Sequence, residues 1–76
     1  MYKVFMVLDE NGEEVKSNLK NCIVKAVKYV VHECLTFIDV VANTTIILEE
    51  LVMGVYYDES ILVVKNEKST YCFVPI

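Results

Sequence analysis

Apolar residues crowd the start of the chain in the stretch YKVFMVL, and the Asn-Gly pair of DENGEE follows at once. Dense β-branched and aromatic residues that end at an Asn-Gly pair are typical of a strand followed by a turn. We therefore predict a strand over residues 2–8. Apolar side chains fall on both of its faces, so we expect an interior strand that is covered on both sides.

A three- and four-residue repeat of apolar positions begins at Val15. This repeat is the period of an amphipathic helix, so the sequence predicts a long helix that runs to about Phe37. Its valines disfavour a helix, but we give the pattern more weight than that preference. The start stays open between a cap at Asn11 and a cap at Ser17, and a short strand over residues 13–16 that pairs with the first strand is an alternative.

The stretch NTTIILEELVMG predicts a short second helix that ends at Gly54. After it, the apolar runs VYY, ILVVK and STYCFVPI alternate with turns, and the last two runs are close enough for an antiparallel hairpin. We find no linker and no repeat. We therefore expect one compact α/β domain over residues 1–76, in the order β-α-α-β-β. Its mixed or antiparallel sheet would have three to five strands, with the long helix on one face.

The amount of apolar side chain is high for so short a chain. Hydrophobic residues make up 55% of its 76 residues. A small domain has a large surface for its volume, so one core cannot hide them all, and we expect the surplus to face a second copy or another protein. No apolar run reaches the roughly 18–20 residues that a membrane span needs. Three cysteines without framework spacing fit free thiols, so we expect a cytoplasmic protein.

The charges argue against nucleic acid as a partner. Eleven acids oppose seven lysines, arginine is absent, and the net charge is −4. Lysine does not supply the bidentate fork with which arginine grips phosphates and guanine edges, and an acidic body repels a polyanion. The acidic surface fits a basic protein partner better, because opposite charges speed the encounter.

Cysteine and histidine are the residues with the most reactive chemistry. On the predicted helix Cys22 and His32 lie about 15 Å apart along the axis, and Cys34 points nearly opposite His32. These groups cannot share a site, and closely spaced cysteine pairs are absent, so we expect no metal site, no cofactor and no catalytic centre. Cys72 is expected to be an ordinary strand residue.

A surface role is the remaining interpretation. We expect a non-enzymatic interaction protein, a homodimer of phage or mobile-element type, that binds another protein as an inhibitor or adaptor. The first alternative is a single-stranded RNA binder that uses a lysine-rich helix face, and the second is a small cysteine-dependent enzyme. The candidate partner-binding residues are Lys25, Lys28, Tyr29, His32, Glu49, Glu50, Tyr56, Tyr57, Asp58 and Glu59.

Overall fold

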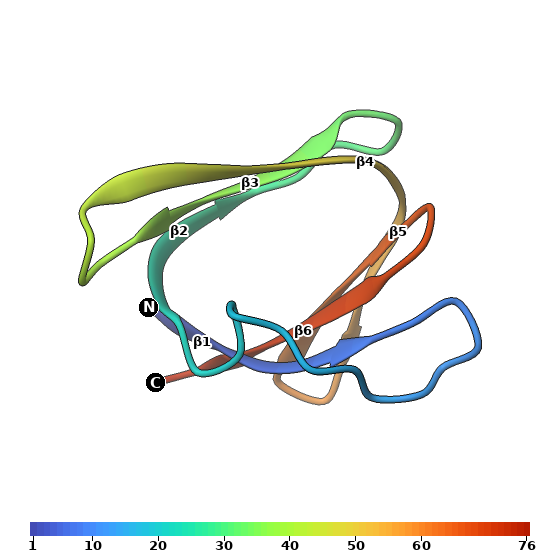
Figure 1. Ribbon diagram of the computed structural model, residues 1–76, viewed down its shortest axis with the longest axis horizontal. Coiled ribbons are helices and arrows are strands. Elements are labelled where there is room, and N and C mark those ends of the chain that lie inside the picture. Colours follow the sequence, from blue (N-terminus) through green and yellow to red (C-terminus); the bar gives the residue numbers. More distant parts are fainter.

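The computed structural model describes residues 1–76 as a closed barrel of six antiparallel strands with no helix (Figure 1). Each strand is hydrogen-bonded to the next along the chain, and the last returns to pair with the first. The strands are β1 (Tyr2–Leu8), β2 (Ile23–Lys28), β3 (Cys34–Asp39), β4 (Thr44–Asp58), β5 (Ile61–Asn66) and β6 (Thr70–Pro75).

The barrel is flattened into two layers because β4 is long enough to serve both. It has 15 residues, and its pairing register shifts between Val52 and Gly54. Before this bulge β4 pairs with β3, and after it with β5. One layer therefore consists of β2, β3 and the first half of β4, and the other of the second half of β4, β5, β6 and β1 (Figure 1).

The seam between β1 and β2 is the weakest join in the barrel. Only two residue pairs, Tyr2 with Val24 and Lys3 with Ile23, hold these strands together directly. The segment 9–22 reinforces the seam with backbone hydrogen bonds: the Asn21 amide donates to the Val4 carbonyl, and the Val4 amide donates to the Cys22 carbonyl. Side chains of this segment, Val15, Leu19 and Cys22, also pack against the core.

Aromatic rings fill the middle of the barrel. Phe37 of β3 meets Phe73 of β6 edge to face at 5.9 Å between ring centroids, and Tyr2 meets Phe73 at 6.4 Å in the same manner. Such edge-to-face pairs bring the two layers together across the interior. The core cluster consists of Val4, Val7, Val24, Leu35, Phe37, Val52, Leu62, Val64, Tyr71 and Phe73.

The predicted α/β fold is wrong, and the long helix is absent. In its place the chain forms a loop, β2, a second loop and β3. Asn21 and His32 have φ values of 71° and 72°, a left-handed conformation that ends any regular element. The short runs between these turns are rich in valine and isoleucine, which favour strands, so these runs form strands rather than helix. The apolar spacing that imitated a helix comes from two strands separated by a turn.

The short second helix is also absent, since residues 44–58 form the longest strand of the barrel. Its residues alternate between the two faces: Ile46 and Leu48 are half-buried, whereas Ile47 and Glu49 are exposed. The strand over residues 2–8 and the C-terminal hairpin are confirmed. The alternative strand over residues 13–16 is reduced to a single bridge between Leu8 and Glu14.

Replacing Phe37 by alanine should cost about 3–5 kcal/mol of unfolding free energy, because its ring is buried against Phe73. A domain of this length has about 4–11 kcal/mol in total, so the urea midpoint should fall steeply. The control is Ile47→Ala on the outside of the barrel, which should change stability by less than about 0.5 kcal/mol. Equal losses in the two variants would contradict the assignment of inner and outer faces.

Candidate functional site

Exposed apolar side chains line the outward face of the first part of β4. Ile47, Leu51 and Met53 are 61%, 41% and 51% exposed. Neighbouring β3 places Thr36 beside Ile47 and Cys34 beside Leu51, and neither supplies enough bulk to cover β4. We call the row Ile47, Glu49, Leu51 and Met53 the β4 strip.

The hairpin between β3 and β4 adds two more exposed valines and projects from one end of the barrel (Figure 1). Val41 at its tip is 86% exposed. The tip is held in shape by Asp39, whose Oδ1 accepts hydrogen bonds from the amides of Val41 and Ala42 at 2.8 and 2.9 Å. Asn43 completes the turn with a φ of 53°. The apolar tip is therefore presented by an ordered turn.

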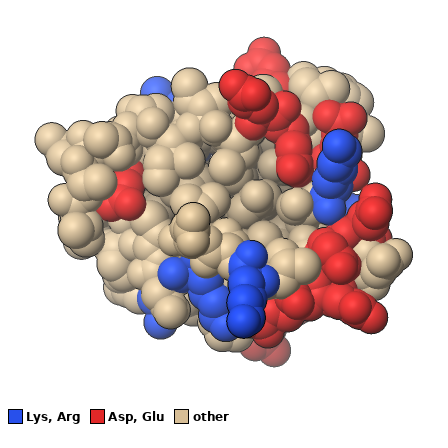
Figure 2. Space-filling view, in the orientation of Figure 1, with Lys and Arg blue, Asp and Glu red and all other residues tan.

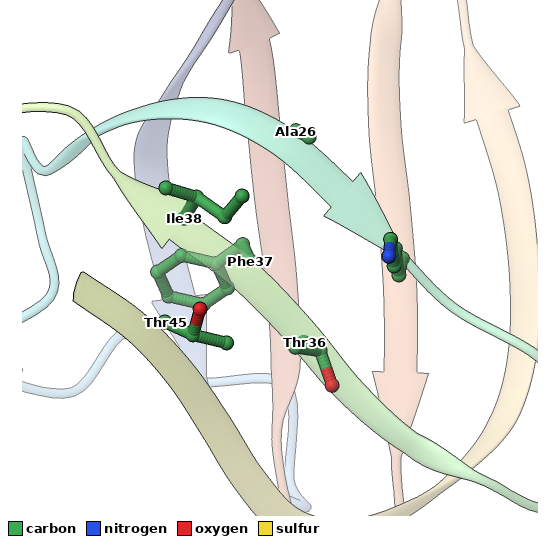
Figure 3. Close-up of a pocket in the computed structure, with 6 residues that line it drawn as sticks. Ala26, Thr36, Phe37, Ile38 and Thr45 are labelled. Atoms are coloured by element: carbon green, nitrogen blue, oxygen red, sulfur yellow. The ribbon is translucent and has the colours of Figure 1, made fainter. Parts of the chain in front are cut away.

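A shallow hollow of about 60 Å³ lies on the outer side of this layer, across β2, β3 and β4 (Figure 3). It forms beside the register shift in β2, where Ala26 has only a methyl group to fill the surface. Ligand pockets usually measure about 300–1,000 Å³, so this hollow is too small for one. Its volume is enough for a single small side chain only. Its lining residues are Ala26, Lys28, Thr36, Phe37, Ile38 and Thr45.

Carboxylates flank the β4 strip. Glu49 is exposed between Ile47 and Leu51. The turn between β5 and β6 brings Glu67 close, because its amide donates to the Leu51 carbonyl at 3.1 Å and its Oε1 accepts from the Leu51 amide at 3.3 Å. More widely, most acids on this face lie on the right of the molecule, over the loop after β1 and the turns at that end, with a lysine side chain among them (Figure 2). A group of lysines lies below the centre (Figure 2).

The predicted pair Glu49 and Glu50 is split between the two faces of β4. Glu50 points inward, and its Oε2 is buried without a hydrogen-bond partner in the protein. Asn66, only 3% exposed, likewise has no protein partner for its side-chain atoms. Burial, and then the charge of Glu50, raise the pKa of Tyr71. Glu50 therefore belongs to the interior, and only Glu49 of the pair is exposed on the outer face.

The predicted basic ridge does not form, because the helix that would carry it is absent. Lys25 and Lys28 are exposed on β2, and His32 is exposed in the loop between β2 and β3. Lys20, from the same stretch of sequence, lies in the segment after β1, where its Nζ pairs with Glu14 at 2.6 Å. These cations lie on separate elements, so they do not form the ridge along one helix that the sequence predicted.

Two predicted tyrosines come together with one that the sequence did not single out. The side chain of Tyr57 lies near those of Tyr2 and Tyr29, and its interaction with them is the main cause of a raised pKa for both Tyr2 and Tyr29. Nothing in the local sequence of Tyr2 indicates this contact, since it depends on how the barrel closes. Tyr56 alternates with Tyr57 along β4 and faces outward.

Asp58 and Glu59 lie at the tight turn between β4 and β5. Both are exposed, and Glu59 has a φ of 57°. Asp58 is paired with Ile61 at the end of the strands, whereas Glu59 turns the chain. The predicted acidic pair is therefore on the surface, on the layer opposite the first half of β4.

The thiols have the properties of structural groups. Cys22 donates to Oδ2 of Asp39 at 3.0 Å, and burial, followed by this hydrogen bond, raises its pKa to about 11. Burial is also the main cause of a raised pKa for Cys72. Cys34 is half-buried beside the β4 strip. The structure contains no group of three or more side chains of the His, Cys, Asp and Glu types that could hold a metal ion.

Comparison with known proteins gives no relative. No protein-family model, no curated protein and no solved structure matches the chain. None of the structure is a helix of the length and apolarity that crossing a membrane requires. The candidate site therefore depends on the geometry of the chain alone.

Iodoacetamide at pH 7.5 should modify Cys22 about 100-fold more slowly in the folded protein than in the urea-unfolded chain. The reason is that a pKa of about 11 in place of 9.0 leaves about 100-fold less thiolate. Peptide mass spectrometry can follow each cysteine. In the control Asp39→Asn, Cys22 should react faster, because one cause of its raised pKa is removed while burial remains. Equal rates in the folded and unfolded chains would contradict the account.

Asp39 should make stability depend on pH in acid. Its pKa is lowered by the hydrogen bond from Cys22 and then by the Ala42 and Val41 amides. A group whose pKa is lower in the folded state stabilises the fold above its unfolded pKa of about 3.9 and loses that effect as pH falls through its folded pKa. Urea midpoints should show Asp39→Asn to be less stable than wild type at pH 7, with a gap that narrows below pH 4. A difference in urea midpoint that stays the same at every pH would contradict this prediction.

Proposed function

We propose that this chain is a non-enzymatic protein-interaction module that acts as an inhibitor or adaptor, and that it binds its partner with the β4 strip and the tip of the β3–β4 hairpin. The observation that carries the proposal is the row of exposed apolar side chains on the strip, which ends near the apolar turn. An exposed apolar patch with a polar rim is typical of a protein-binding surface.

The closed barrel determines how such a partner could bind. Proteins that bind by adding a strand need a free sheet edge, and all six strands here have neighbours on both sides. On the β4 strip the exposed groups are side chains, so we infer that the partner contacts side chains there rather than adding a strand. Met53 supports this mode, because methionine adapts its shape to different apolar surfaces. The hollow lined by Ala26 and Thr36 gives one fixed position for a partner side chain beside the strip.

The charges favour a partner with a basic rim around an apolar centre. The chain carries a net charge of −4, and Glu49 and Glu67 lie beside Leu51. Charges at the rim of an interface mainly raise the rate of encounter and select among partners, while the apolar centre supplies the affinity. We therefore infer binding that is fast at low salt and slower at high salt.

The two earlier alternatives gain no support. The RNA-binding alternative depended on a helix face that the chain does not form. The cysteine-dependent alternative needs an exposed thiol of low pKa, whereas Cys72 is buried and its pKa is raised.

Ile47→Asp should remove partner binding, because it places a charge in the middle of the apolar strip. The wild-type chain, immobilised, should capture a defined set of proteins from a lysate of its source cells, and the variant should capture at least about tenfold less of them. The matched control is Ser60→Asp, which adds the same charge at the exposed turn between β4 and β5. Circular dichroism should show that both variants fold.

A second charge test separates the strip from the rest of the acidic surface. Glu49→Lys should weaken capture, and most strongly at low salt. The control Glu10→Lys makes the same charge change in the loop after β1 and should weaken capture less. Undiminished capture by Ile47→Asp, or equal losses for Glu49→Lys and Glu10→Lys, would refute this surface.

A further inference from the structure

Two side chains on the other layer are buried although they point away from the barrel interior. Val63 of β5 and Cys72 of β6 are only 4% and 9% exposed, yet neither belongs to the core cluster. Val63 lies between Leu62 and Val64, which do belong to it, so alternation along the strand places Val63 on the outer face. Apolar neighbours on the outside must cover these two side chains.

The strand register shows which residues surround them. Tyr56 is paired with Val63, Val63 with Cys72, and Cys72 with Met6. These four side chains form a continuous apolar row across the outer face of the layer. Tyr56 at one end is 55% exposed, and Phe5, beside Met6 in the bulge of β1, is 43% exposed. The row therefore has a covered centre, and its accessible apolar surface is the ring of Tyr56 at one end and that of Phe5 beside the other.

The next outward row has opposite charges at its two ends. Asp58 is paired with Ile61, and Lys3 with Val74. The pairing of Leu62 with Phe73 places Ile61 beside Val74. The row across β4, β5, β6 and β1 thus reads acid, apolar, apolar, base.

We propose that this face binds a second copy of the chain, about a two-fold axis that runs parallel to β5 and β6 and passes between them. Such an axis exchanges the positions of β4 and β1 in the two facing sheets. It therefore places Asp58 opposite the partner's Lys3, Tyr56 opposite the partner's Met6, and Val63 opposite the partner's Cys72. A two-fold interface must be self-complementary, and this row has its charges in the order that the symmetry requires.

The size of the face indicates how strongly two copies of the chain should associate. Four strands about 4.8 Å apart and about six residues long cover roughly 19 by 20 Å, or roughly 400 Å² in projection on each copy. Counted over both copies this is roughly 800 Å², which is less than a standard stable interface buries, so the dimer should be weak and transient, in the micromolar range or weaker. The inference goes beyond the proposed function, since it uses the opposite layer and leaves the β4 strip free.

The decisive experiment is charge reversal followed by mixing, read by sedimentation velocity from about 5 to 500 μM, a range that brackets a dissociation constant of that size. Wild type should shift from monomer to dimer over this range. Asp58→Lys alone sets like charges opposite each other at both ends of the interface, as does Lys3→Asp alone, so each should dimerise at least about tenfold more weakly. A mixture of these two variants should restore association, because in the mixed dimer both pairs are again opposite in sign.

The controls keep the test independent of folding. Lys25→Asp makes the same charge reversal on β2 and should dimerise as wild type does. Tyr56→Asp changes an exposed side chain at one end of the apolar row and should leave a folded monomer. A wild type that stays monomeric at every concentration would overturn the proposal, and so would single variants that dimerise normally or a mixture that does not associate.

Discussion

The pairing of β1 with β6 is the constraint on which the rest of the structure depends. It joins the two ends of the chain by six residue pairs from Tyr2 with Pro75 to Leu8 with Thr70, and it turns a meander of strands into a closed barrel. Closure brings Phe73 into contact with Tyr2 and within reach of Phe37 on the opposite layer. It also pairs the two terminal strands with each other, so neither is left as the free edge of an open sheet.

Closure also explains why so much apolar surface remains outside. A small barrel can enclose only one side of each strand, and 13 of the 76 residues are buried. The surplus collects on two outer faces, the β4 strip on one layer and, on the other, the exposed rings of Tyr56 and Phe5 at the two sides of the row through Val63 and Cys72. The two faces differ in their charge pattern. Acidic side chains flank the β4 strip, whereas the row beside Val63 and Cys72 has an acid, Asp58, at one end and a base, Lys3, at the other. One chain could thus hold a second copy and another protein at the same time.

The sequence was sufficient to predict those strands whose apolar runs end in clear turn residues, namely the first strand and the two strands of the last hairpin. It was misleading between residues 15 and 54, because strands joined by turns without glycine imitate helical spacing. Asn21, His32 and Asn43 adopt left-handed backbone there, and only Asn is a familiar signal for it. Of the surface proposed here, the sequence singled out only Glu49, because Ile47 and Leu51 were read as part of a short helix until β4 was seen to be a strand.

Nuclear magnetic resonance of the backbone tests barrel closure most directly. The account predicts cross-strand contacts between β1 and β6, such as those that link Val4 with Phe73 and Met6 with Cys72, together with slow amide exchange in both strands. It also predicts extended-chain chemical shifts from Ile23 to Lys28 and from Thr44 to Asp58. Helical shifts in either stretch, or the absence of contacts between the two terminal strands, would contradict it.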